Sequence, residues 1–205
     1  MNNTTGNSNL AVGPWAATNV TTASYSIAIG QSALRTNQTN NYNVAVGHYA
    51  LYAAKANGTV GVGQYALGAT TTGTNNTAVG YYALKANTLG IDNIALGYQA
   101  LQANTTAQKN VAVGSASLAS NTVGSWNIGI GFYSLRNNTT GQSNIAIGTR
   151  SLNSNTTGQN NTAIGYYALY TNTIGVSNVA IGCKPLYNST ADSLVAIGHY
   201  ALYTN

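Results

Sequence analysis

The sequence predicts an all-β protein, a parallel β-solenoid of about twelve coils of 17 residues. Three observations lead to this prediction. A glycine returns at a nearly constant interval, a short aliphatic run precedes each glycine, and a group rich in Asn, Thr and Gly follows it. Such a regular short repeat is typical of stacked arrays, in which each unit buries its apolar residues only against its neighbours.

The repeat is defined by its glycines, and each unit is numbered here from its glycine as position 0. Successive glycines are 17 residues apart, except at two places where the interval is 16. The predicted organisation is a lead-in over residues 1–8 and one solenoid domain of twelve units over residues 9–205. The twelve glycines are Gly13, Gly30, Gly47, Gly63, Gly80, Gly97, Gly114, Gly131, Gly148, Gly165, Gly182 and Gly198.

The first element of each unit is a short strand at positions −3 to −1. Position −3 is Ile, Val or Leu in ten of twelve units, position −1 is so in all twelve, and position −2 is always Ala or Gly. A large-small-large alternation rich in β-branched residues indicates a strand and is too short for a helix. We predict that the large residues form core ladders, as at Ile145, Ile147, Ile164, Val179 and Ile181.

The second element follows the glycine. Position +3 is Ala or Ser except at Pro185, and position +4 is Leu in eleven units, which predicts a second short strand or a bend. We expect Leu152, Leu169 and Leu186 to join the core ladder. Asn at position +7, then Thr and often Gly, predicts the turn that closes the unit.

Stacking places like residues above one another. Adjacent coils of a parallel stack lie about 4.7–4.9 Å apart, so twelve coils predict a rod of roughly 55–60 Å. Asn recurs at position −4, for example at Asn127 and Asn144, where its amide is expected to bond along the stack. Because such a coil is thin and position −2 is always small, we expect the chains to associate. The sequence leaves open whether the −3/−1 face or the −2 face meets the partner.

The composition limits the classes of partner. Only 4% of residues are charged, Glu is absent, and the net charge is +5. The seven basic residues lie far apart in the sequence, so we expect no nucleic-acid partner. We also expect no membrane insertion, because no apolar run approaches the roughly 18 residues of a membrane-spanning helix.

The sequence predicts no catalytic, cofactor or metal site. His48 and His199 occupy the same position +1 in distant units, so they are not expected to meet within one chain. The two carboxylates, Asp92 and Asp192, are too few for the aspartate ladders of calcium-binding solenoids. Cys183 is the only cysteine, which excludes an internal disulfide. We therefore expect a protein that is not an enzyme.

Tyrosine recurs at position +2, and two interpretations of this column stay open. Exposed rings flanked by Asn and Thr are suited to stack against sugars and bond their hydroxyls. Alternatively, the rings cover the edge of the coil or a groove between chains, with the phenol reaching water. The candidate glycan-contact residues are Tyr49, Tyr65, Tyr82, Tyr133, Tyr167 and Tyr200.

The box N-x-A-[VI]-G followed by x-x-[AS] is seen from Asn144 to Ser151 and again from Asn178 to Pro185, where Pro185 departs from the pattern, and it resembles a known repeat. It is similar to the head repeats of trimeric autotransporter adhesins and the related repeats of bacteriophage tail fibres. The resemblance implies a left-handed parallel β-roll, three chains around a threefold axis, and an adhesive surface. This unit is longer than that of the adhesin heads, and the sequence shows no signal peptide, neck, stalk or anchor.

These observations lead to a functional expectation. We expect a homotrimeric structural or adhesive fibre of a phage tail or head, located at the virion surface or outside the cell. Other virion or fibre proteins and host-surface glycans are the expected partners, and no cofactor is expected. The alternatives are a bacterial surface adhesin, a self-assembling extracellular filament and, ranked lower, an ice-binding protein.

Overall fold

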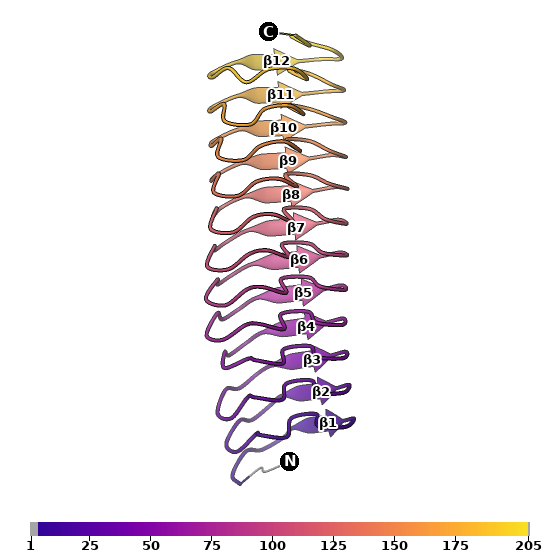
Figure 1. The fold of residues 1–205 in the computed structure, drawn as a ribbon, viewed down its shortest axis with the longest axis vertical. Coiled ribbons are helices and arrows are strands. Elements are labelled where there is room, and N and C mark those ends of the chain that lie inside the picture. The colour runs from indigo at the N-terminus through magenta and orange to yellow at the C-terminus, as the bar shows by residue number, and fades with distance from the viewer. Residues whose placement is uncertain (1–3, 205) are drawn as a thin grey trace.

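The structure is a computed structural model that describes residues 4–204. Within this range it contains twelve strands of three residues each and no helix. The strands follow one another up a single rod, with the first and last strands at its opposite ends (Figure 1). They are β1 (Leu10–Val12), β2 (Ile27–Ile29), β3 (Val44–Val46), β4 (Val60–Val62), β5 (Thr77–Val79), β6 (Ile94–Leu96), β7 (Val111–Val113), β8 (Ile128–Ile130), β9 (Ile145–Ile147), β10 (Thr162–Ile164), β11 (Val179–Ile181) and β12 (Val195–Ile197).

All strands form one parallel sheet in sequence order, so each coil stacks on the coil before it. Equivalent residues pair in register, as Ala95 does with Ala112. The two shorter units keep this register, and Val44 pairs with Val60 across the first of them. The missing residue is therefore lost from the turn. The predicted β-solenoid is confirmed.

The predicted lead-in already follows the repeat where it is described. The backbone N atoms of Thr4 and Thr5 donate to the carbonyl of Thr21, and Thr4 Oγ1 donates to the same carbonyl at 3.1 Å. Thr71 makes the same hydroxyl contact with Thr88 at 3.1 Å, further up the rod. Residues 4–8 thus form part of a repeat turn, while residues 1–3 of the predicted lead-in lie outside the described range.

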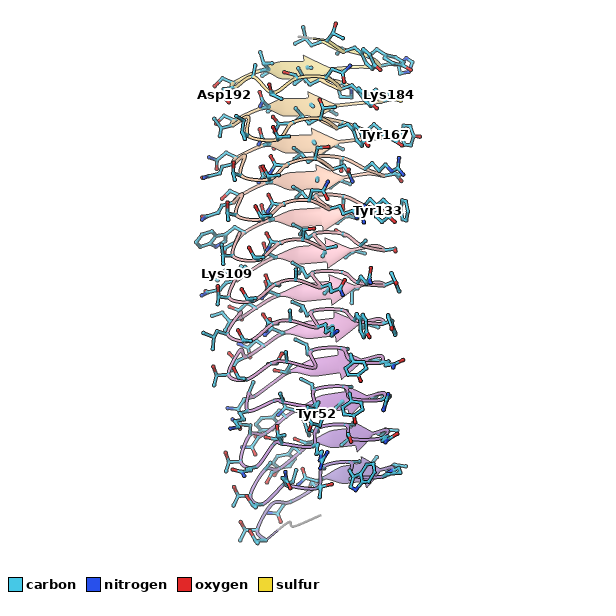
Figure 2. The ribbon with its side chains drawn as sticks, viewed as in Figure 1. Tyr52, Lys109, Tyr133, Tyr167, Lys184 and Asp192 are labelled. Atoms are coloured by element: carbon cyan, nitrogen blue, oxygen red, sulfur yellow. The ribbon has the colours of Figure 1, made fainter. Side chains whose placement is uncertain are left out.

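Each coil has two turns, which run along opposite edges of the rod. The first turn follows the strand, and the second closes the coil before the next strand. Figure 2 shows Tyr133, Tyr167 and Lys184 projecting along one edge, and Lys109 and Asp192 along the other. These edges are called here the first-turn edge and the second-turn edge.

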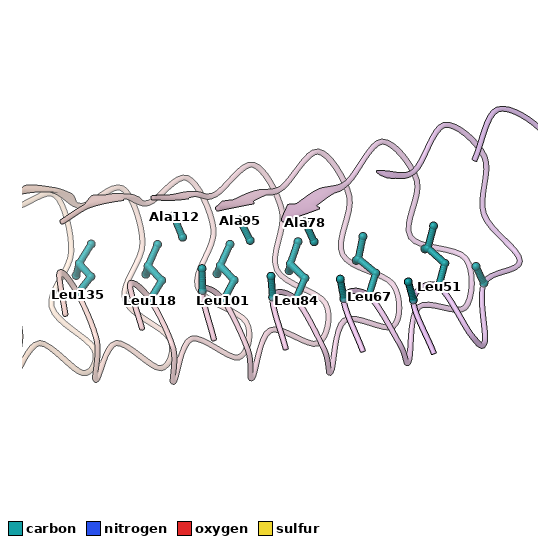
Figure 3. Close-up of a cluster of buried hydrophobic side chains, with 14 of the residues drawn as sticks. Leu51, Leu67, Ala78, Leu84, Ala95, Leu101, Ala112, Leu118 and Leu135 are labelled. Carbon is teal, nitrogen blue, oxygen red and sulfur yellow. The ribbon is translucent and has the colours of Figure 1, made fainter. Parts of the chain in front are cut away.

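The core is a narrow column of alanine and leucine (Figure 3). Ala95, the middle residue of β6, and Leu101, at position +4 of the same coil, are both completely buried. The predicted core residues Leu152, Leu169 and Leu186 are buried in the same column, as expected. In ten of the coils, one leucine at position +4 is therefore the largest apolar side chain of the interior. The first coil has Ala17 at this position, and Leu202 of the last coil is 47% exposed.

The predicted core positions Ile145, Ile147, Ile164, Val179 and Ile181 are wrong. These side chains are half-buried or exposed on the outer face of the sheet, because the small residue between them points inward. Successive residues of a strand face opposite sides, so only one of the two sets enters the coil.

The thinness of the coil decides which set enters. The segment that carries the leucines runs close beneath the sheet. At Gly61, the middle residue of β4, even an added Cβ would lie only 3.1 Å from Leu51 Cγ. Alanine or glycine fits this space and a branched side chain does not, which places the large residues outside.

Asparagine ladders replace a larger apolar core. At position −4, Asn144 Nδ2 donates to Asn127 Oδ1 at 3.2 Å and to the Gly158 carbonyl at 2.8 Å. At position +7, Asn155 Nδ2 donates to Asn138 Oδ1 at 2.8 Å. Both ladders are buried, and their bonds satisfy amides that would otherwise be costly to remove from water.

The first turn depends on left-handed backbone conformations. Gly131, at position 0, has φ of 130°, and an added Cβ would lie 2.6 Å from the Gly148 carbonyl oxygen of the next coil. Tyr133 and Leu135 follow with φ of 58° and 48°, in a region that non-glycine residues rarely adopt. Here the leucine enters the core while the tyrosine stays at the edge.

Candidate interaction surfaces

The outer face of the sheet is a long apolar strip. It consists of the first and third residues of β1–β12, which are Val, Ile or Leu except for Thr77 and Thr162. Exposure is greatest at the ends of the rod, where Val195 is 65% and Ile197 is 68% exposed. Ile130 in the middle is still 37% exposed. This strip is called here the outer apolar face, and no segment of residues 4–204 covers it.

The strip is narrow and straight, because every strand has three residues and pairs in register. Eleven steps of about 4.8 Å make it roughly 53 Å long, and it is two side-chain columns wide. Apolar patches of this extent on a protein surface usually mark a contact with another molecule. The small residues at position −2, by contrast, face the interior and are not available to a partner.

The tyrosines of position +2 all lie on the first-turn edge. Tyr49, Tyr65, Tyr82, Tyr133 and Tyr167 are half-buried, and Tyr200 is 44% exposed. Four of these rings pack against rings of adjacent coils, as Tyr49 does on Tyr65, with ring centroids 5.1 Å apart and planes 3° from parallel. The rings of Tyr133 and Tyr200 contact rings of their own coil.

The rings at position +5 extend this packing. Tyr187 stacks between Tyr170 and Tyr203, with centroid distances of 5.1 Å to each. Neighbouring rings therefore cover both faces of Tyr187. This packing supports the interpretation in which the rings cover the coil edge and the phenols reach outward.

Five of the seven basic residues lie among these rings. Lys85 Nζ lies 4.2 Å from the ring centroid of Tyr82, and Arg136 Cζ lies 4.4 Å from that of Tyr133. All five occupy position +2 or +5 and therefore share the first-turn edge. They are Arg35, Lys85, Arg136, Arg150 and Lys184.

The fold thus gathers cations that are far apart in the sequence. Linear spacing did not indicate this arrangement, because consecutive members such as Lys85 and Arg136 are 51 residues apart. The signal that predicts it is their shared phase within the repeat. Fifty-one residues are three periods of 17, so both residues take position +5 on the same edge.

The second-turn edge holds both carboxylates. Asp92 Oδ1 accepts a hydrogen bond from Asn75 Nδ2 at 3.2 Å, and Asp192 Oδ1 accepts one from the Val176 backbone N at 2.7 Å. Lys109 shares this edge (Figure 2). Lys55 belongs to it as well, because its backbone N donates to the Thr71 carbonyl in the second turn. The rod is therefore basic along one edge and close to neutral along the other.

Several pKa values on the first-turn edge depend on these contacts. Burial raises the pKa of Tyr187, and the charges of Tyr170 and Tyr203 raise it further. A hydrogen bond to Tyr200 raises the pKa of Lys184, whose Nζ lies 3.4 Å from that hydroxyl. Lys184 therefore stays positively charged at neutral pH.

The second turn carries a threonine ladder. Thr122 Oγ1 donates to the Thr139 carbonyl at 3.1 Å, and Thr139 Oγ1 donates to the Thr156 carbonyl at 3.1 Å. These hydroxyl protons are engaged within the rod, so they do not form an array directed at water.

The described residues offer little chemistry of other kinds. Within residues 4–204 no three His, Cys, Asp or Glu side chains come together as metal ligands, and the surface has no pocket. His48 packs against Tyr49 and Tyr65, and Cys183 is a half-buried free thiol. No helix in this range is long and apolar enough to cross a membrane.

Comparison of the chain with models of protein families, with curated proteins and with solved structures gives no match.

Proposed function

We propose that this chain is a structural and adhesive fibre protein, a homotrimeric β-solenoid shaft or head of a phage tail or head fibre. In this role it supports or supplies contact with the host surface, and it is not an enzyme. It acts at the virion surface or outside the cell, beside other fibre or virion proteins. The repeat resemblance supplies the biological class, and the outer apolar face supplies the physical argument.

The observation that carries the proposal is this unpartnered face. An isolated rod would keep two full-length columns of Val, Ile and Leu in water, at a cost of about 25 cal/mol for each Å² exposed. A strip roughly 53 Å long and three residues, about 10 Å, wide covers about 530 Å², which is two thirds of the area that each partner contributes to an interface of standard size. Association of like chains through this face removes the cost along the whole rod.

A threefold arrangement fits the shape of the strip. The two aliphatic columns lie two residues apart along each strand, about 6.6 Å, which allows each chain to offer one column to each of two neighbours. Closed symmetry also leaves no apolar column free, which prevents uncontrolled aggregation. The first-turn and second-turn edges then stay outside, available for contact with a host surface.

Light scattering of the purified full-length chain tests the assembly. We expect a particle of three times the chain mass of 21.1 kDa. A double variant of the outer apolar face, Ile130→Glu with Ile147→Glu, is expected to be monomeric. It should keep its β circular dichroism, because neither side chain enters the coil.

A matched control places the same charges on the second turn. Leu89 and Val123 are exposed there, so Leu89→Glu with Val123→Glu is expected to leave the trimer intact. A wild-type monomer at micromolar concentration would contradict the proposal, and so would equal dissociation of both variants. A stable dimer would retain the apolar interface but rule out the threefold arrangement.

The virion role needs a separate test. Purified native particles that carry the chain can be analysed by mass spectrometry after crosslinking. We expect crosslinks from the chain to itself and to other fibre proteins. Recovery of the chain only from cell envelopes would favour a bacterial surface adhesin instead.

The ice-binding alternative is less well supported by the geometry. The threonine ladder has its hydroxyl protons bonded to carbonyls of the rod, and the flat face of the sheet is aliphatic. We expect no thermal hysteresis from the assembled protein, measured by the freezing behaviour of a dilute solution.

A further inference from the structure

The first-turn edge is positively charged, and no carboxylate side chain of residues 4–204 lies on it to neutralise this charge. Five of the seven basic residues lie there, and both aspartates lie on the opposite edge with hydrogen-bond partners of their own. In a chain with only 4% charged residues, this separation dominates the electric field around the rod. A long, straight edge of one sign attracts a long anion.

The cations are held in place by the tyrosines. Arg150 donates to the Tyr167 hydroxyl, and its Cζ lies 5.8 Å from the ring centroid of Tyr133. Lys184 lies 5.5 Å from the ring centroid of Tyr200. Such contacts restrain flexible side chains and leave the charge intact. A ligand then meets cations that are already positioned, which lowers the entropy cost of binding.

From this geometry we propose that the first-turn edge binds an acidic polysaccharide lying along the rod. The cations contact its carboxylate or sulfate groups, and the outward phenols bond its hydroxyls. Each coil rises about 4.8 Å, close to the length of one sugar ring, so successive coils meet successive sugars. Arg150 and Lys184 share position +2 two coils apart, about 9.5 Å, which suits a polymer with one anion per disaccharide.

Two observations favour a polysaccharide over a nucleic acid. Single-stranded nucleic acids bind by stacking bases on free aromatic faces, but neighbouring rings already cover faces such as those of Tyr187. The charge is also sparse, because the five cations are spread over nine coil steps, about 43 Å. Duplex DNA has one charge for roughly every 1.7 Å of its axis.

This inference rests on the proposed attachment role for its biological meaning, and it names the chemical class of the surface that is contacted. The physical argument for binding depends only on the charges and contacts of the first-turn edge. The full-length protein is tested against heparin as a sulfated polymer, polygalacturonate as a carboxylated polymer, dextran as a neutral polymer and poly(dT) as a nucleic acid. Affinities are measured at several salt concentrations.

The decisive variants remove equal charge from the two edges. Arg150→Gln with Lys184→Gln is expected to weaken binding to the acidic polymers at least about tenfold and to reduce the salt dependence. Lys55→Gln with Lys109→Gln is expected to change the affinity for the acidic polymers by less than about twofold, because those cations lie on the second-turn edge. Arg150→Lys with Lys184→Arg keeps both charges and should retain most of the affinity.

Four results would each overturn the proposal. Two concern the polymers: no binding of either acidic polymer, or binding of dextran as tight as that of the acidic polymers. The others are tighter binding of poly(dT) than of the acidic polymers, and an equal loss of affinity in the two double Gln variants. The mass of the same samples by light scattering separates this inference from the proposed function. A trimer that binds no acidic polymer refutes only the inference. A monomer that binds one through the first-turn edge refutes only the trimeric fibre.

Discussion

Asn93 donates two hydrogen bonds to the same oxygen of Asn76, one from its backbone N at 3.0 Å and one from its Nδ2 at 3.1 Å. Asn93 Nδ2 also donates to the Ala107 carbonyl at 2.8 Å, within its own coil. One buried side chain therefore joins two coils and closes one of them. The hydrogen bonds of its amide thus stabilise a coil that is too thin for a larger apolar core.

Removal of this amide should be costly. We expect Asn93→Ala to lower the free energy of unfolding by about 2–4 kcal/mol, because the Ala107 carbonyl and the Asn110 backbone N lose buried partners. Denaturant unfolding at fixed protein concentration measures the loss. Gln108→Ala, at an exposed position in the same coil, should change it by less than about 0.5 kcal/mol. Similar losses in both variants would refute a structural role for the ladder.

The same ladder logic predicts a stabilising change. Thr70 occupies the Asn position +7, and its buried hydroxyl has no partner. Thr70→Asn offers Oδ1 to Asn87 Nδ2 above and Nδ2 to the turn carbonyl, so we expect a gain of about 1 kcal/mol in thermal or denaturant unfolding. The reciprocal change Asn121→Thr should destabilise the rod, because it interrupts bonds to Asn104 and Gly124. A loss of stability in Thr70→Asn would count against this account.

Glycine at position 0 should tolerate no side chain. In Gly131→Ala, the new Cβ meets the Gly148 carbonyl oxygen at 2.6 Å and the backbone has φ of 130°. We expect a loss of more than about 3 kcal/mol in unfolding free energy, or failure to fold. Gly68→Ala is the comparison, because an added Cβ there has its nearest neighbour at 3.3 Å and Ala119 already stands at the equivalent position +5 of another unit. Gly68→Ala should be the milder change, and an equal effect would contradict this explanation.

The leucine column should behave as a true core. Leu118 is completely buried, and we expect Leu118→Ala to cost about 2–5 kcal/mol in unfolding free energy. Leu89 is 53% exposed on the second turn, so Leu89→Ala should cost less than about 0.5 kcal/mol. A small cost at Leu118 would show that the interior is not the close-packed column described above.

Alkaline pH should weaken the rod at its first-turn edge. Burial raises the folded-state pKa of Tyr187 above its ordinary value of 10.0, so the unfolded chain loses this proton first as pH rises. The stabilising contribution is complete below pH 10.0 and is lost as pH rises through the folded-state pKa. Lys184, with a pKa raised above 10.5, loses its contribution in the same direction.

Unfolding free energies measured between pH 8 and pH 12 test this effect. We expect the loss above about pH 10 to be smaller in Tyr187→Phe, which removes the ionisable hydroxyl and keeps the ring. A wild-type stability that stays constant up to pH 12 would contradict the assigned cause.

Much of the architecture follows from periodicity alone. A 17-residue period predicts that Gly131 lies beneath Gly148 and Asn127 beneath Asn144, since stacked units repeat their contacts. The strands and the asparagine ladder at position −4 were predicted from that phase, and the structure confirms them. The asparagines at position +7 were predicted only as turn residues, and the structure shows that they form a second buried ladder. The phase also contained the signal for the basic edge, although the linear distances between its members concealed it.

The amino-acid sequence alone specifies the repeat, its register and the existence of two unlike strand faces. The three-dimensional packing of the coil is needed to show that Ala146 turns inward while Ile145 and Ile147 turn outward. A strand that alternates large and small residues can turn either set inward, so the alternation does not identify the inner face. That choice depends on the distance between the sheet and the leucine segment beneath it, which leaves room for a methyl group and for nothing larger.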